Sequence, residues 1–457
     1  MNKIAKRAGI LMLFMLILIA GFTFFVCEYV TRAGDWVLFP GSPHIYQNGN
    51  INCGTVVDRD GAILLKMEQG NRVYSANSVL RKATLHWIGD RYGYISATAV
   101  PHYAAQMAGF DLLNGTYSYA NQGGVASLTL SSRVQMAALE AMGSYKGTVA
   151  VYNYKTGELI CAVTTPNYDP DQIPDMSNDT AGIYEGIYWN RFTQSTYTPG
   201  SIFKIVTAAA ALETRPELQD QLFTCTGSYE LQGEYITCES AHYTQDLKQA
   251  FCNSCNCAFA QIAIELGPDV MERYAKSFGI TQPITFDGIT TAAGNFEASD
   301  ALLNLGWSAV GQYRDQINPC TFLTFIGAVA NGGKGVKPYL VDRITVGENT
   351  TYQAKSQSMD RIMSSAAAEL IAEYMRNNVQ TKYGDENFPG LTVCAKTGTA
   401  EVDGGNKPNA MLAGFVSDEQ YPLAFVVCVE DGGYGRQVCV PIASKVLAAC
   451  KEILDQV

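Results

Sequence analysis

Residues 147–166 of the chain read GTVAVYNYKTGELICAVTTP, two apolar alternating runs separated by Lys155-Thr156-Gly157. Apolar residues at every second position predict β-strands, and the short polar junction is typical of a hairpin. Three similar runs come near the end of the chain, LTVCAKTGTAEV (391–402), AMLAGFVSD (410–418) and YPLAFVVCVED (421–431). Two early and three late strands predict a five-stranded, largely antiparallel sheet.

Helical patterns surround these strands. A mostly helical region is expected from about residue 199 to 375, packed beside the sheet as a helical subdomain. The runs SSRVQMAALEAMGSY (131–145) and PIASKVLAACKEIL (441–454) are expected to form helices against the other face of the sheet. The predicted fold class is therefore α/β, more narrowly α+β, with a sheet flanked by helices.

The N-terminus carries a candidate membrane span. Residues 8–30 are almost wholly apolar, and Lys3, Lys6 and Arg7 precede them. The run exceeds the roughly 7–15 apolar residues of a signal peptide, and no A-x-A cleavage site follows promptly, so an uncleaved anchor is favoured. By the positive-inside rule we expect a single-pass protein of the cell membrane, with its N-terminus cytoplasmic and the rest of the chain extracytoplasmic.

Length and charge set further limits. The 457 residues carry a formal net charge of -11, and only 16% are charged, which excludes the basic surface that nucleic-acid binding needs. We expect three segments: 1–33, the cytoplasmic tip and anchor; 34–140, a β-rich N-terminal pedestal; and 141–457, the domain that carries the chemistry.

Ser201 lies three residues before Lys204 in the stretch YTPGSIFK, which precedes the apolar helical run IVTAAAALE. The Thr-Pro-Gly turn signal predicts that Ser201 lies in the first turn of a helix. Residues three apart share a helical face, so the lysine amine can reach the serine hydroxyl. Because a desolvated lysine can act as a base, this spacing predicts a serine nucleophile activated by Lys204.

Two Ser-x-Asn triplets compete as partners of this pair. Ser75-Ala76-Asn77 lies ahead of the nucleophile, in the expected pedestal. Ser254-Cys255-Asn256 lies between the helical runs DLKQAFCN and CAFAQIAIEL, where a tight turn can direct both polar side chains into a cleft. We therefore predict Ser254 and Asn256 as site residues.

Two Lys-Thr-Gly triplets also compete. Lys155-Thr156-Gly157 is most simply the hairpin turn described above, with a solvated lysine. Lys396-Thr397-Gly398-Thr399 lies within a strand that follows the nucleophile. An ammonium group with two hydroxyls is suited to a substrate carboxylate, and a strand edge can hold an extended peptide. We predict Lys396, Thr397, Gly398 and Thr399 as the substrate-binding strand.

Thirteen cysteines are many, and an odd number, for an outward-facing domain. Cys225 and Cys238 flank a predicted hairpin and are the best disulfide candidate, with free buried thiols as the alternative. Cys252, Cys255 and Cys257 contain a C-x-x-C step, but no second pair lies near them in the sequence. No metal site and no cofactor are therefore predicted.

The ordered set YTPGSIFK, SCNCAFAQIA, NPCTFLTFIGAVANGG and CAKTGTAE resembles the class B, monofunctional penicillin-binding proteins. The resemblance covers roughly residues 147 to 457, and extends more weakly to Val57-Asp58-Arg59-Asp60-Gly61 and LTLSSRVQ, which are similar to that family's pedestal. It implies the penicillin-binding transpeptidase fold for residues 141–457 and a serine-type D-Ala-D-Ala transpeptidase activity.

The resemblance also implies roles for the nucleophile and its neighbours. Ser201 would attack the penultimate D-alanine carbonyl of a peptidoglycan stem peptide, with Lys204 as base. Ser254 would relay a proton to the leaving D-alanine, and Asn256 would hold the substrate amide. An amine from a neighbouring strand would resolve the acyl-enzyme into a cross-link, and β-lactams would acylate Ser201 instead.

For the strand, the resemblance implies that Lys396 assists the proton network. With Thr397 and Thr399 it would bind the terminal carboxylate, beside Gly398. The backbone amides of Ser201 and Thr399 would form the oxyanion hole.

The resemblance has departures and implied partners. Cys53 precedes Gly54 where the family usually has an arginine, and His242-Tyr243 replaces the His-Gly that commonly precedes S-x-N. No glycosyltransferase domain is recognised before residue 140, so a polytopic SEDS-type glycosyltransferase in the membrane is the implied partner. The implied process is cell-wall biogenesis, in cell shape, cell division or sporulation.

Three alternative functions differ from a transpeptidase in a testable property. A membrane-anchored β-lactamase would also deacylate with water, for which Asp300 is the candidate carboxylate. A penicillin sensor would normally need several spans and a cytoplasmic effector, and a non-catalytic scaffold of the wall-building complex would not need Lys204 and Lys396.

Overall fold

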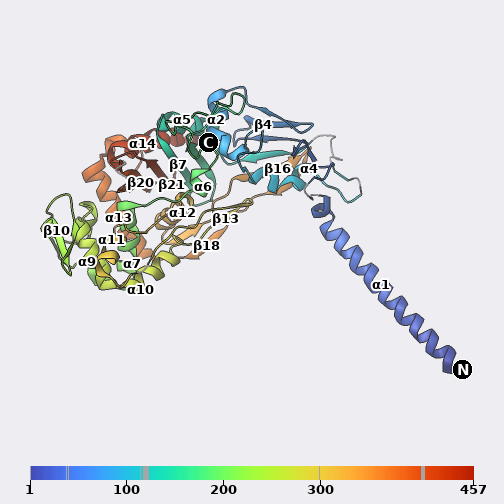
Figure 1. Cartoon of the computed structure of the whole chain (residues 1–457), viewed down its shortest axis with the longest axis horizontal. Helices are drawn as coiled ribbons and strands as arrows, with labels where there is room; N and C mark the ends of the chain where they lie inside the picture. The colour runs from blue at the N-terminus through green and yellow to red at the C-terminus, as the bar shows by residue number, and fades with distance from the viewer. Residues whose placement is uncertain are drawn as a thin grey trace.

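The computed structural model describes residues 2–37, 39, 41–113, 115–116, 123–297, 299–402 and 407–456. Figure 1 shows an elongated molecule in which helix α1 (Asn2–Val37) projects from one end. A five-stranded sheet of long strands and its helices, here called the large sheet, occupy the opposite end. A six-stranded sheet of shorter strands lies between α1 and the large sheet.

Helix α1 exposes apolar side chains around its circumference. Leu11, Phe14 and Ile17 are 69%, 66% and 59% exposed. About 20 apolar residues are enough to cross a hydrocarbon core, and the segment Lys3–Val37 is long and apolar enough to do so. The predicted span is confirmed in length and composition.

The five-stranded sheet predicted from the sequence is present, and each neighbouring pair is antiparallel. Its strands, in spatial order, are β19 (Val393–Ala400), β20 (Asn409–Val416), β21 (Leu423–Glu430), β7 (Lys146–Asn153) and β8 (Leu159–Thr165). Strands β20 and β21 are buried along almost their whole length, which explains their continuous apolar sequences. Strand β19 lies at the edge of the sheet.

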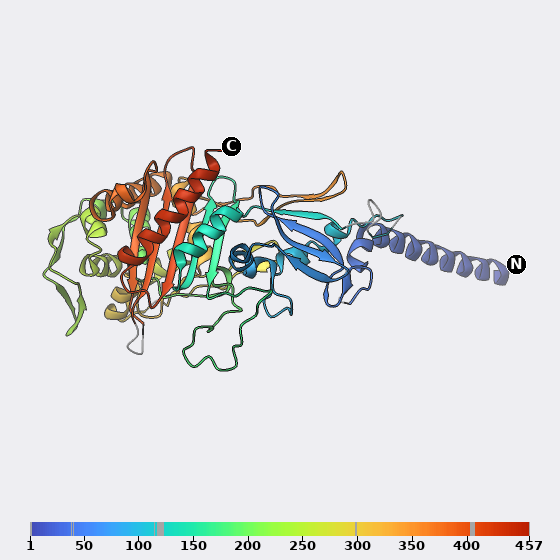
Figure 2. The same cartoon turned by 90° about the horizontal axis from the view of Figure 1, so that it is seen from above.

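Helices cover both faces of this sheet. Helices α5 (Ser132–Met142) and α14 (Gly435–Leu454) lie side by side across one face, as Figure 2 shows. Val149 and Val151 of β7 pack into their layer, whereas Ala150 and Tyr152 pack into the layer that contains α12 (Pro319–Ala330). The period of two in strand β7 thus divides its side chains between two buried cores.

The helical subdomain lies on the side of α12. Its helices are α7 (Lys204–Thr214), α8 (Leu247–Cys252), α9 (Asn256–Leu266), α10 (Pro268–Ser277), α11 (Leu302–Ser308) and α13 (Ser365–Asn378). Helix α8 begins at a capping box, in which Asp246 and Gln249 each accept from the other's backbone amide. Short strands interrupt the subdomain: β9 (Phe223–Cys225), β10 (Ser228–Leu231), β11 (Glu234–Thr237), β12 (Tyr243–Gln245), β13 (Thr285–Phe286), β14 (Ile289–Thr290), β15 (Lys334–Val336) and β18 (Ser358–Arg361).

A second, six-stranded sheet forms most of the region between α1 and the large sheet. Its order is β17 (Asn349–Gln353), β16 (Val341–Val346), β6 (Val125–Leu128), β3 (Cys53–Val57), β4 (Ile63–Glu68) and β5 (Asn71–Tyr74). The expectation of a mostly helical region from 199 to 375 is therefore corrected. Hairpin β16–β17 comes from that region and returns to pair with β6, because Val341 and Ile344 find apolar cover there.

The remaining elements are short connections around the two sheets. They are β1 (Tyr46–Gln47), β2 (Asn50–Ile51), α2 (Ser78–Ile88), α3 (Ala99–His102), α4 (Ala104–Ala108), α6 (Arg191–Gln194), η1 (Gly200–Phe203), η2 (Pro216–Gln219), the π-helical turn η3 (Val379–Tyr383) and η4 (Asp385–Asn387).

Candidate active site

The turn that carries Ser201 is pressed against the edge strand of the large sheet. Ser201 lies in the 3-10 turn η1, directly before helix α7. Gly200 has φ +55°, and a Cβ at this position would lie 2.5 Å from the Thr399 carbonyl oxygen. The Gly200 amide donates to the Gly311 carbonyl oxygen over 2.9 Å. Only glycine allows this close approach, which sets Ser201 beside β19.

Lys204 is fully buried, and oxygen atoms of neighbouring residues surround its amine. Its Nζ lies 2.7 Å from Ser201 Oγ, 2.7 Å from Asn256 Oδ1 and 2.9 Å from the Ser254 carbonyl oxygen. Burial lowers the pKa of Lys204 to about 8. A fraction of this lysine is therefore a neutral base near pH 7, within hydrogen-bond reach of a serine hydroxyl.

The turn between α8 and α9 carries Ser254 and Asn256, the polar residues of the S-x-N triplet. Ser254 adopts the left-handed conformation, with φ 53°. Its hydroxyl accepts from Lys204 Nζ over 3.2 Å and from Lys396 Nζ over 3.0 Å. Asn256 donates from Nδ2 to the Thr237 carbonyl oxygen over 2.8 Å, which fixes the orientation of its amide. The turn thus links both lysines to one hydroxyl.

Lys396 enters the site from strand β19. Its side chain is 1% exposed, and Nζ also donates to the Thr397 carbonyl oxygen over 3.0 Å. Burial, and next the positive charge of Lys204, hold the pKa of Lys396 well below its usual range. Two buried amines that share one serine hydroxyl form a path along which a proton can move.

Tyr383 is a site residue that the sequence did not predict. Its phenol oxygen accepts from the Thr397 amide over 2.9 Å and lies 3.0 Å from Thr397 Oγ1. Burial raises the pKa of this phenol, so it remains protonated. Asn378 donates to the Ala395 carbonyl oxygen over 3.0 Å and holds the same strand. No motif surrounds Tyr383 in the sequence, and only its place after α13 brings it to β19.

The competing motif copies have structural roles. Asn77 is the N-cap of α2, where its side chain accepts from the amides of Val79 and Leu80. Lys155 lies at an exposed turn and donates to Asn331 Oδ1 over 2.7 Å. Asp300, the candidate carboxylate of a lactamase, is exposed just before α11.

Ser201, Lys204, Ser254, Asn256 and Lys396 are therefore brought into direct contact, and Thr397, Gly398 and Thr399 continue along the edge strand beside them. A buried lysine in contact with a serine hydroxyl, a second buried lysine and a strand at the edge of the sheet define the class of the protein. It is a serine acyltransferase of the penicillin-recognising kind.

Comparison with known proteins identifies the family. Residues 147–448 match the penicillin-binding protein transpeptidase domain. The peptidoglycan D,D-transpeptidase PbpA of Mycobacterium tuberculosis is 28% identical over 364 residues, which cover 72% of each chain. The chain belongs to the penicillin-binding protein transpeptidase family, as a class B member, and it is an enzyme.

Solved structures share the fold. Penicillin-binding protein A of M. tuberculosis, in a ceftriaxone acyl-enzyme complex, matches with a TM-score of 0.76 and 24% identity over 89% of this chain and 98% of that chain. The D,D-transpeptidase domain of a peptidoglycan glycosyltransferase from Eggerthella lenta matches with a TM-score of 0.76 and 25% identity over 89% and 99%. The predicted fold class is confirmed.

Proposed function

We propose that this protein cross-links peptidoglycan stem peptides through an acyl-enzyme on Ser201, and that β-lactams acylate the same oxygen. One observation carries the proposal: the 2.7 Å contact of Ser201 Oγ with the buried amine of Lys204, whose pKa is about 8. The family match and the similarity to peptidoglycan D,D-transpeptidases support the choice of substrate.

Acylation begins with Lys204 in its neutral form. Its amine takes the Ser201 hydroxyl proton while Oγ bonds to the carbonyl carbon of the penultimate D-alanine. The amides of Ser201 and Thr399 donate to the oxyanion, which is favoured at the start of a helix. The bond from this carbon to the nitrogen of the terminal D-alanine then breaks, and that nitrogen receives a proton by way of the Ser254 hydroxyl.

Transfer to the acceptor reverses these proton movements. An acceptor amine attacks the ester carbon and gives up a proton towards the Ser254 hydroxyl and the lysines. Ser201 Oγ leaves and recovers a proton from Lys204. Each step therefore restores the starting groups, and no cofactor is needed for the balance.

Substrate recognition is assigned to strand β19 and the S-x-N turn. Lys396 with Thr397 and Thr399 would bind the terminal carboxylate, beside Gly398, whose Cβ would lie 2.8 Å from the Pro199 carbonyl oxygen. Asn256 Nδ2 donates one of its two hydrogens to the Thr237 carbonyl, and its second hydrogen would hold the oxygen of a substrate amide. Strand β19 is an edge strand of the sheet, a position that suits the binding of an extended peptide.

The rest of the chain would place this site at the cell surface. We assign 1–33 to the cytoplasmic tip and anchor, 34–140 to the pedestal and 141–457 to the transpeptidase domain, with hairpin β16–β17 completing the pedestal sheet. The positive residues in the first turns of α1, ahead of its apolar run, support a cytoplasmic N-terminus. The class B resemblance supports a polytopic SEDS-type glycosyltransferase as partner, which would supply the glycan strands.

A fluorescent penicillin tests the proposal. The full chain in detergent should take up one label on Ser201 and hold it for hours after unbound penicillin is removed. Ser201→Ala should take up none, whereas Ser195→Ala, a half-buried serine six positions earlier, should label like the parent. Rapid release of label would indicate a lactamase. Absence of label on a folded protein would indicate a scaffold. A stable label without release of D-alanine from a D-Ala-D-Ala peptide would indicate a sensor.

A further inference from the structure

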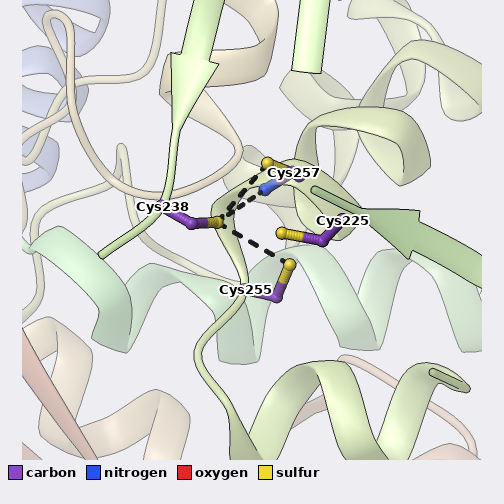
Figure 3. Close-up of side chains that lie close together, drawn as sticks. All are labelled: Cys225, Cys238, Cys255 and Cys257. Atoms are coloured by element: carbon purple, nitrogen blue, oxygen red, sulfur yellow. Dashed lines mark hydrogen bonds between the residues drawn. The ribbon is translucent and has the colours of Figure 1, made fainter. Parts of the chain in front are cut away.

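Four cysteines from three separate elements meet beside the active site. Cys225 ends strand β9, Cys238 follows β11, and Cys255 and Cys257 begin helix α9. Figure 3 shows their sulfur atoms directed towards a common centre, and all four Sγ atoms lie within 4.8 Å of one another. The sequence shows no second pair near the C-x-x-C step, and the fold brings Cys225 and Cys238 to Cys255 and Cys257.

The cluster differs from the cysteine pairing expected from the sequence. All thirteen cysteines are free thiols, including Cys225 and Cys238. Cys252, which begins the C-x-x-C step, is outside the cluster, with its Sγ 3.1 Å from Thr381 Oγ1. Cys238 Sγ lies 3.4 Å from Cys257 Sγ and 3.8 Å from Cys255 Sγ. These separations are far longer than the roughly 2.05 Å of a disulfide.

The same separations fit a metal centre. Four thiolates at about 2.3 Å from a tetrahedral zinc ion have sulfur atoms about 3.8 Å apart. The Cys238–Cys255 separation of 3.8 Å equals that value and the Cys238–Cys257 separation of 3.4 Å is slightly shorter, and all four sulfur atoms lie within 4.8 Å of one another. Cys225, Cys255 and Cys257 are buried and Cys238 is partly buried, as expected of a closed structural site.

Backbone amides are already directed at two of the sulfur atoms. The Cys257 amide donates to Cys238 Sγ, and the Ala258 amide donates to Cys255 Sγ, each over 3.4 Å. Cys255 is the N-cap of α9, where the helix dipole favours negative charge. His242 Nδ1 lies 3.5 Å from Cys225 Sγ, from outside the set. Such donors are the usual outer partners of thiolate ligands.

We propose that Cys225, Cys238, Cys255 and Cys257 bind one zinc ion as a structural site. Binding releases four thiol protons to solvent and forms four zinc–sulfur bonds, so the centre carries a net charge of -2. The cysteines change no oxidation state. The ion would join the β9 and β11 segments to the start of α9.

The position of this centre connects it to catalysis. Cys255 is the middle residue of the S-x-N triplet, and Cys257 follows Asn256 directly. Ser254 is held in the left-handed conformation, and Asn256 donates to Thr237, the residue before Cys238. A zinc ion would therefore hold both partners of the Asn256–Thr237 hydrogen bond in place, and with them Ser254. The four cysteines act as positioning residues and touch no substrate.

Metal analysis of the full chain tests the site without reference to activity. Protein purified in detergent and thiol reductant should contain about one zinc per chain by plasma mass spectrometry. Cys225→Ser and Cys255→Ser should lose it, whereas Cys252→Ser, a neighbouring thiol outside the set, should keep it. Cys225→His, which restores a zinc ligand, should also keep it. A protein free of zinc, or with disulfides among these four cysteines, would overturn the proposal, as would bound iron and sulfide.

The coupling to catalysis rests on the proposed acylation of Ser201. Removal of zinc with a chelator should slow acylation by a fluorescent penicillin about 10-fold, the lower end of what loss of an outer support costs. Added zinc should restore the rate in the parent and in Cys225→His, but not in Cys225→Ser. Full zinc occupancy with no labelling at any stage would contradict the acylation and leave the metal site intact. An unchanged rate in verified zinc-free protein would overturn the positioning role.

Discussion

Lys204 and Lys396 are buried amines that both contact Ser254 Oγ. Two positive charges that contact the same oxygen atom repel each other, and both amines are buried, so the pair is most stable with one proton missing. The proposed mechanism needs Lys204 to be the neutral member when Ser201 Oγ attacks the substrate carbonyl. The surroundings of the site thus supply the base without a carboxylate.

The pKa of Lys204 leads to a pH prediction. Burial lowers this pKa to about 8, and the neutral form dominates above it. The second-order rate constant for acylation should therefore rise about tenfold per pH unit below pH 8 and level off above it. Stopped-flow measurement with a β-lactam that does not ionise between pH 6 and 9 checks the profile. A rate that is flat from pH 6 to 9 would exclude Lys204 as the titrating base.

The two Lys-Thr-Gly triplets offer a matched pair of variants. Lys396→Ala removes a buried amine from the Ser254 hydroxyl and should lower the acylation rate by about 10²-fold or more. Lys155→Ala changes the same motif at an exposed turn and should leave the rate within about 2-fold. Fluorescent penicillin labelling over time compares them, and equal losses in both variants would show that the choice of triplet is wrong.

Tyr383 should act in binding more than in chemistry. Tyr383→Phe leaves the Thr397 amide and hydroxyl without their phenol partner and loosens the carboxylate site. We expect the concentration for half-maximal acylation to rise about tenfold, equivalent to roughly 1.4 kcal/mol, while the limiting rate changes little. Tyr374→Phe, a buried tyrosine whose hydroxyl has no hydrogen-bond partner among the described residues, is the control. A fall in the limiting rate alone would contradict this role.

At the residue scale, the sequence predicted the groups that belong to motifs and missed those that do not. Ser201, Lys204, Asn256 and their partners are linked by short spacings and by order along the chain. Tyr383 and Thr237 reach the site only through the packing of α13 and of the β10–β11 hairpin. Cys225 and Cys238 also join Cys255 and Cys257 through that packing, which no local spacing encodes.

At the scale of elements, the contact of the nucleophile turn with β19 decides whether the site is assembled. Gly200→Ala would place a Cβ 2.5 Å from the Thr399 carbonyl and push the turn away from the strand. A displacement of about 1 Å at a reacting group can cost 10²-fold, so we expect a loss of that size in the acylation rate.

Gly182→Ala provides the control for this variant. Gly182 has φ +64°, close to the φ of Gly200, but open space surrounds its missing Cβ. Both variants carry the backbone strain of alanine at positive φ, and only Gly200→Ala carries the clash. Comparable acylation rates in the two would mean that the close approach to β19 is unimportant.

The sheets show why some elements were predicted and others were not. Strands β7, β8, β20 and β21 have long apolar sequences, because they are almost wholly buried. Strand β17 has no fully buried residue, and its partner β16 pairs with β6, which lies some 200 residues earlier in the chain. A short and half-exposed strand has little hydrophobic alternation in its sequence. Its place in the six-stranded sheet could therefore not be predicted from the residues around it.

At the scale of the whole molecule, the N-terminal part and the catalytic part are joined by more than the chain connection. Hairpin β16–β17 crosses from one part to the other. Arg81 of α2 donates from Nε and Nη2 to the two carboxylate oxygens of Asp169, over 2.7 and 2.6 Å. Both side chains are nearly buried, and a paired guanidinium and carboxylate in that setting fixes geometry. The Arg81–Asp169 pair and the hairpin thus fix the smaller N-terminal part against the part that carries the candidate active site.

In the proposed orientation, α1 crosses the membrane with Lys3, Lys6 and Arg7 on the cytoplasmic side. In wall-less cells that express the chain, a membrane-impermeant fluorescent penicillin should label the protein, and protease added outside should remove everything after α1. A cytoplasmic protein that survives the protease shows that the cells are intact. Replacing the three basic residues with asparagine removes the positive-inside signal and should lower the labelled fraction. Protection of the catalytic domain in intact cells expressing the parent chain would place it in the cytoplasm and overturn the proposed orientation.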